Sequence, residues 1–142
     1  MCLMLYIGTA EELPLSSSPD MSIEDVDEPG RAVTQWFSQR HVRFIGAHGS
    51  CSCGFPSVVA ESPIEYYEGM SIDSRDPDDR RSVAALLQLL RQLVAHSARV
   101  ELYPVWNGEE SLSPKGVIEW QLGTLMPKRF FFNERFMHIV RP

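Results

Sequence analysis

The sequence is short of cationic side chains, of cysteine and of long apolar runs, and each shortage excludes a class of protein. Thirteen Lys and Arg stand against 19 Asp and Glu, which gives a net charge of −6. Non-specific binding to nucleic acid needs many basic side chains, so we expect no nucleic-acid partner. The apolar run Leu3 to Ile7 is far shorter than the roughly 20 residues of a membrane span. We therefore expect neither a membrane protein nor a secretory leader.

The motifs of common catalytic sites are also missing. The chain has no P-loop, no G-x-G-x-x-G fingerprint, no G-x-S-x-G elbow and no H-E-x-x-H zinc motif. Its acidic pairs, Asp78 with Asp79 and Glu109 with Glu110, fall at an expected helix start and an expected turn. Capping and solvation account for acidic side chains in such places. The sequence therefore favours a protein without catalytic residues.

The composition is that of one ordinary globular domain. The 142 residues are 44% hydrophobic and 23% charged. A chain of this length and composition can form a hydrophobic core without disulfide bonds or metal ions to stabilise it. Three cysteines, an odd number without a leader, indicate free thiols in a reducing cytoplasm. We expect a single cytoplasmic domain over residues 1–142.

Hydrophobic periodicity predicts strands separated by two main helices. The expected strands are Leu3 to Ile7, Met21 to Val26, Val42 to Gly46, Arg99 to Trp106, Val117 to Leu122 and a final hairpin or bent strand over Arg129 to Val140. The longer helix has Asp76 as its N-cap, Pro77 in its first turn and an apolar stripe from Val83 to Val94. The shorter one starts at Pro29 and carries Val33 and Trp36 on one face.

The predicted fold class is α+β, with a single mixed β-sheet and both main helices packed on one face of it. This arrangement is the simplest way to bury both apolar stripes. Pro104 lacks an N–H and so places the Arg99 to Trp106 strand at a sheet edge or strand end. A partly open face and an open edge predict a protein partner or a two-fold homodimer.

The stretch HGSCSCGF, from His48 to Phe55, holds two of the three cysteines. Thiolates at positions i and i+2 of an extended segment point the same way and can share an ion. Cys2 joins them if the first strand runs antiparallel to the strand before this loop, and not if the two are parallel. The candidate ligands for tetrahedral zinc are Cys2, His48, Cys51 and Cys53, although C-x-C is tighter than the usual C-x₂₋₄-C of structural zinc loops.

Two other interpretations of this loop stay open. A reactive thiol needs a lowered pKa, for which His48 offers an imidazole, but the sequence after Cys53 is not typical of a helix start. Inert cysteines would instead pack as small hydrophobes, with Gly49 and Gly54 forming a tight turn.

The opening MCLMLYIG resembles that of class II glutamine amidotransferases, which begin with a catalytic cysteine on a strand. The resemblance implies that Cys2, freed by removal of Met1, is a nucleophile whose own amine acts as base. It also implies an oxyanion hole at Asn107 and Gly108, which here follow Trp rather than His. The later Asp of that family is missing, since no Asp follows Asp79.

A longer set of features covers most of the chain. M-C-x-M-L-Y-I-G at the start, H-x-x-C-x-C-G-F in the loop and VELY after the long helix resemble a family of small uncharacterised bacterial proteins. This resemblance implies a bacterial source and no particular chemistry.

The function that the sequence favours is that of a small acidic binding protein. Its negative surface would steer basic partners toward it, as in inhibitor and immunity proteins. The alternatives are a thiol or zinc-type metal protein centred on Cys51 and Cys53, and an N-terminal-cysteine amidohydrolase.

Overall fold

The computed structural model describes residues 2–28, 30–55, 57–58, 76–125 and 132–142. Seven strands form one mixed sheet, in the order β2-β3-β4-β1-β6-β9-β7. They are β1 (Leu3–Thr9), β2 (Ser16–Ser17), β3 (Met21–Glu24), β4 (His41–Ala47), β6 (Val100–Trp106), β7 (Gly116–Gln121) and β9 (Phe136–Arg141). A separate parallel pair joins β5 (Ser57–Val58) to β8 (Phe132–Asn133). The helices are α2 (Pro77–Val94) and the 3₁₀ helices η1 (Gly30–Trp36), η2 (Ser52–Gly54) and η3 (Leu122–Thr124).

The centre of the sheet is β1, which pairs antiparallel with β4 on one side and with β6 on the other. Its alternating side chains point to opposite faces, so both faces of the strand are buried. Leu5 and Ile7 belong to one hydrophobic cluster and Tyr6 belongs to another. The α+β class with one mixed sheet is therefore confirmed.

The long helix α2 covers the face that carries Leu5 and Ile7. Its start follows the local signals, since Asp76 accepts a hydrogen bond from the Asp78 N–H at 2.9 Å and Pro77 occupies the first turn. The predicted apolar stripe is buried against the sheet through Val83, Leu86, Leu87, Leu90 and Val94.

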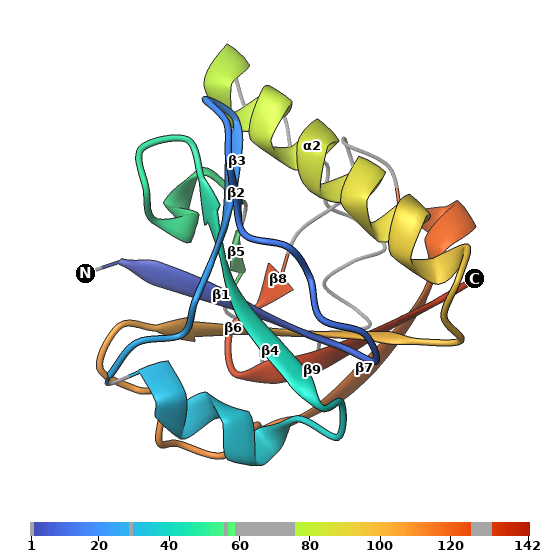
Figure 1. Cartoon of the computed structure of the whole chain (residues 1–142). Coiled ribbons are helices and arrows are strands. Elements are labelled where there is room, and N and C mark those ends of the chain that lie inside the picture. Colours follow the sequence, from blue (N-terminus) through green and yellow to red (C-terminus); the bar gives the residue numbers. More distant parts are fainter. Residues whose placement is uncertain (1, 29, 56, 59–75, 126–131) are drawn as a thin grey trace.

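The second helix does not share this face, so the prediction of two helices on one face is not confirmed. Val33 of η1 packs with Tyr6 and Tyr103, in the cluster on the opposite side from α2. Figure 1 shows α2 and η1 on opposite sides of the sheet. Because β1 and its neighbours are apolar on both faces, each face needs a cover of its own.

Pro104 was predicted to lie at a sheet edge or a strand end, and the edge alternative is wrong, because β6 lies between β1 and β9. The carbonyl of Pro104 accepts a hydrogen bond from the Arg135 N–H at 2.7 Å, and so it faces the β9 side. A residue in a strand directs its N–H and its C=O toward the same neighbour. The pairing with β9 covers Val100 to Leu102 only, so the nitrogen of Pro104 interrupts no ladder bond.

At the other end of the sheet, β7 pairs parallel with β9 and forms an edge. Its exposure alternates as predicted, with Ile118 and Trp120 half-buried between exposed residues. The predicted last stretch divides at a turn into β8 and β9, and its beginning, residues 129–131, lies outside the described residues. Among the described helices, none is both long and apolar enough to span a membrane.

Candidate functional site

The antiparallel pairing of β1 with β4 brings the three cysteines together. The register runs from Leu5 opposite Ile45 to Thr9 opposite His41. The start of β1 therefore lies beside the end of β4, where the loop after Ala47 begins (Figure 1). The sulfur atoms of Cys2, Cys51 and Cys53 all lie within 4.8 Å of one another.

A tight turn starts the loop. Gly49 and Ser50 both have positive φ, 79° and 77°, a conformation that is uncommon for a serine. The Ala47 N–H donates to the carbonyl of Cys51 at 2.8 Å and closes the turn. This turn returns the chain to the end of β4 and places Cys51 beside the strand that it has just left.

Ser52, between the two cysteines, fixes the loop to the central strands. Its side chain is fully buried, and its hydroxyl donates to the Ile45 carbonyl at 2.6 Å and accepts from the Leu5 N–H at 2.8 Å. The serine thus bridges β1 and β4 and holds one cysteine on either side of itself. The sequence analysis missed this role, because only the tertiary structure shows what the hydroxyl contacts.

Gly54 allows the loop to pack closely. A Cβ at this position would lie 2.7 Å from Cδ2 of His48 and 2.8 Å from Cβ of Ala47. Contacts this short do not occur between real side chains, so a larger residue would displace His48 or the loop. The glycine in C-x-C-G is therefore required by packing rather than by a positive φ.

The sulfur geometry suits a soft metal ion. With metal–sulfur bonds of about 2.3 Å, two thiolates on a tetrahedral ion lie about 3.8 Å apart. The sulfur atoms of the cluster lie within 4.8 Å of one another. To bind one ion, each sulfur–sulfur distance would therefore have to shorten by no more than about 1 Å. Cys2 and Cys53 are exposed and Cys51 is half-buried, so solvent reaches the cluster.

The three thiols also influence each other's protonation. Burial raises the pKa of Cys51, but the N–H of Cys53 and the neighbouring thiols of Cys53 and Cys2 stabilise its thiolate and leave that pKa lowered. Burial, the bond to Cys51 and the nearby negative charge raise the pKa of Cys53 to about 11, against the opposing effect of the Leu3 N–H. That N–H donates to the Cys53 sulfur at 3.3 Å. Of Cys51 and Cys53, Cys51 is therefore the thiol that ionises first.

His48 lies in a different cluster from the cysteines, although the sequence analysis grouped it with them. Its Nε2 lies 2.5 Å from Oδ1 of Asp79, and with Asp76 these residues form a separate group of potential ligands. The His48 N–H donates to the hydroxyl of Ser82 at 3.0 Å. His48 thus connects the loop to the first turns of α2.

The Asn107 and Gly108 pair lies next to Cys2, as an amidotransferase-like site would require. The Asn107 N–H, however, donates to the carbonyl of Cys2 at 2.8 Å. The Gly108 N–H donates to the carboxylate of Glu110 at 2.8 Å. Because both backbone donors are engaged, neither is free to hold an oxyanion.

Cys51 and Cys53 of this hydrogen-bonded loop and Cys2 at the start of β1 thus form a cluster of three thiols that solvent reaches. No protein-family model, curated protein or solved structure matches the chain, so the resemblance to a bacterial family stays a prediction.

Proposed function

We propose that the protein binds a thiophilic metal ion, with Zn²⁺ as the first candidate, through Cys2, Cys51 and Cys53. The observation that carries the proposal is the convergence of three sulfur atoms within 4.8 Å, from two segments far apart in the sequence. Thiolate sulfur is a preferred ligand of Zn²⁺.

Electrostatics support a cation at this position. Two neighbouring thiolates repel each other, and this repulsion contributes to the raised pKa of Cys53. A bound cation removes the repulsion, deprotonates the remaining thiols and releases protons as it binds. Inert packing explains the cluster less well, because Cys2 and Cys53 are exposed.

The ligand count points to exchange of the ion rather than permanent retention. Structural zinc sites are closed by four protein ligands, whereas sites that exchange or activate a ligand keep one position open. The sulfur cluster offers three ligands, and His48 is engaged with Asp79. The fourth position is then left to water or to a thiolate from outside. This favours a protein that carries or senses the ion.

The test is metal analysis of freshly purified protein, kept reduced and without an N-terminal tag that would crowd Cys2. We expect one equivalent of zinc. Replacement by Co²⁺ should give a sulfur-to-metal charge-transfer band, and Cys51→Ser should weaken binding at least tenfold. Protein that binds neither ion when fully reduced would refute the proposal.

His48→Gln provides the control variant, since it removes an imidazole that lies outside the sulfur cluster. Circular dichroism should first establish that the variant is folded. We then expect near wild-type affinity for Co²⁺. A loss as large as that of Cys51→Ser would instead support the four-ligand site that the sequence analysis predicted.

A further inference from the structure

A second site lies on the η1 side of the sheet. A pocket of about 210 Å³ is formed by β1, β4, the segment after β3 and the loop between β6 and β7. Among the described residues that line it, five are acidic and none is Lys or Arg; the acidic ones are Glu24, Asp25, Asp27, Glu28 and Glu110. The pocket therefore has a strongly negative lining.

Glu110 is the unusual member of this set. It lies in a turn, as predicted, but the prediction that it is solvated there is wrong, because its side chain is only 2% exposed. Its Oε2 accepts a hydrogen bond from the Gly108 N–H at 2.8 Å. Its Oε1 is buried and receives no hydrogen bond of normal geometry from the described residues, although the carboxylate does interact with the neighbouring Tyr6 hydroxyl. A buried carboxylate with a single well-formed hydrogen bond and no cationic partner among the described residues is costly, so it calls for an explanation.

The other buried glutamate shows what a satisfied carboxylate looks like in this fold. Glu101 is also 2% exposed. Its Oε1 accepts from the N–H and hydroxyl of Ser38 and from the N–H of Gln39, while its Oε2 pairs with Arg99 at 3.0 Å. Glu101 thus has a cationic partner within the chain. Among the described residues Glu110 has no cationic partner at Oε1, and it is the one of the two that lines the pocket.

The remaining lining is aromatic and aliphatic. The rings of Tyr6 and Phe44 meet edge to face with centroids 5.8 Å apart, and Met4 and Val26 line the same space. Burial first, and then the negative charge of Glu110 and the hydrogen-bonding interaction with its carboxylate, raise the pKa of Tyr6 above its usual value. Its hydroxyl therefore stays neutral beside the carboxylate. Flat apolar walls around a carboxylate suit a weakly hydrated planar cation.

A bare metal ion fits this pocket less well. Among the described residues, the groups of three or more ligand atoms close enough to share an ion are the three cysteines and the cluster of His48, Asp76 and Asp79. The carboxylates of the pocket belong to neither group. They surround a space too wide for one ion to bridge, so a larger cation is needed to contact them together.

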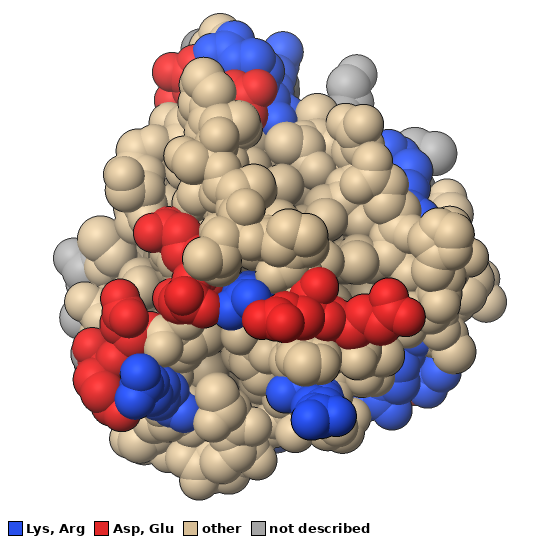
Figure 2. All heavy atoms as spheres, viewed as in Figure 1, with Lys and Arg blue, Asp and Glu red and all other residues tan. Residues whose placement is uncertain are grey.

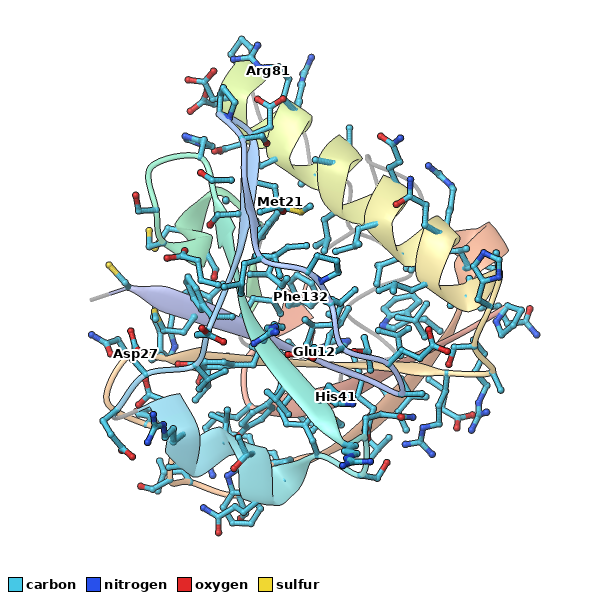
Figure 3. The ribbon with its side chains drawn as sticks, in the orientation of Figure 1. Glu12, Met21, Asp27, His41, Arg81 and Phe132 are labelled. Atoms are coloured by element: carbon cyan, nitrogen blue, oxygen red, sulfur yellow. The ribbon has the colours of Figure 1, made fainter. Side chains whose placement is uncertain are left out.

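The charges at the mouth of the pocket are only partly neutralised. Asp25 forms an ion pair with Arg43, and Glu28 lies 3.9 Å from Arg31. Figure 2 shows acidic side chains gathered over the lower left and centre of this face. In Figure 3, Asp27 lies on the left side of the molecule, close to the start of η1. An incoming cation is therefore attracted before it reaches Glu110.

We propose that this pocket binds the guanidinium group of an arginine, which pairs with Glu110 between the aromatic and aliphatic walls. A guanidinium offers several N–H donors in one plane, pairs with carboxylates and stacks on aromatic rings. A space of about 210 Å³ has room for the end of an arginine side chain from a partner protein. The proposal gives the sequence-based prediction of a basic partner a definite chemistry. It does not depend on the thiol site.

Calorimetric titration with arginine capped at both ends, N-acetyl-arginine N-methylamide, tests the proposal. We expect millimolar binding and none of the neutral citrulline analogue, which has a similar shape. Glu110→Gln keeps an acceptor for Gly108 and should weaken binding about tenfold or more. Glu109→Gln removes the same charge from the preceding residue, which does not line the pocket, and should bind nearly as wild type does.

Further arms identify the source of the cation. If the capped compound binds more tightly than free arginine, the partner is a polypeptide, because the acidic mouth repels the carboxylate of the free amino acid. If free arginine binds more tightly, the pocket recognises the guanidinium of the free amino acid. Equal binding to wild type and Glu110→Gln would overturn the proposal. So would tight binding of Ca²⁺ without binding of the arginine compound. Glu110→Gln should remain folded, because it removes an unpaired buried charge.

Discussion

Acidification should destabilise this protein through His138, at the centre of β9. The side chain is 1% exposed, and its Nδ1 accepts a hydrogen bond from the indole N–H of Trp120 at 3.0 Å. The ring proton is therefore on Nε2, which lies 3.3 Å from the carbonyl of Asn133. Protonation would place a second proton on the ring, at Nδ1, where it would face the indole N–H of Trp120 and break that hydrogen bond. Burial lowers the pKa of His138 to about 4, although the bond to Asn133 partly offsets this effect.

The size of the effect follows from the difference between the folded and unfolded chains. The unfolded histidine takes up its proton near pH 6.5, whereas the folded one stays neutral down to about pH 4. Its contribution to stability is complete above about pH 6.5 and is lost as the pH falls from about 6.5 to about 4. A difference of about 2.5 pKa units, at about 1.4 kcal/mol each, amounts to about 3 kcal/mol.

Urea unfolding over this pH range measures the free energy directly. His138→Gln keeps an acceptor for Trp120 but does not titrate, so it should be less stable at neutral pH and lose less stability on acidification. The carboxylates act on both proteins alike and cancel in the comparison. His96→Gln, at an exposed position, is the control and should follow the wild type. If His138→Gln and the wild type lose the same free energy between about pH 6.5 and 4, the reasoning is refuted.

Three further outcomes test the fold and the loop. Leu90→Ala, at a fully buried position on α2, should cost about 2–5 kcal/mol in urea unfolding, and a loss below about 0.5 kcal/mol would mean that the helix stripe is not packed. Ser52→Ala leaves the Leu5 N–H and the Ile45 carbonyl without this partner. It should cost about 2 kcal/mol or more and weaken Co²⁺ binding at the cysteines, and unchanged binding would show that the serine does not position them. The predicted homodimer should give twice the monomer mass in light scattering at high concentration, and a monomer mass there would exclude it.

Local signals predicted the elements whose formation depends on neighbouring residues. The start of α2 could be predicted because Asp76 and Pro77 act within one turn of the helix, and its buried stripe because helical periodicity is a property of the segment. The alternation at Ile118 and Trp120 likewise predicted β7. The apolar run of β1 predicted a buried strand without showing which strands lie beside it.

Strand order and strand direction were decided only by the tertiary structure. The pattern of β1 is the same for parallel and antiparallel pairing, and the meeting of Cys2 with Cys51 and Cys53 depends on that choice. The pairing of His48 with Asp79 required α2 to lie over the loop, and nothing in either segment encodes that contact.

By itself, then, the sequence determined the α+β class, the long helix and the loop that carries two thiols, because periodicity, capping and turn residues act over short stretches. The tertiary structure decided that Pro104 lies inside the sheet and that η1 and α2 take opposite faces. It also decided that Glu110, which looks like a surface residue in a turn, is buried with an unpaired oxygen. The physical reason is that burial and pairing depend on residues distant in the chain, whose positions no local pattern specifies.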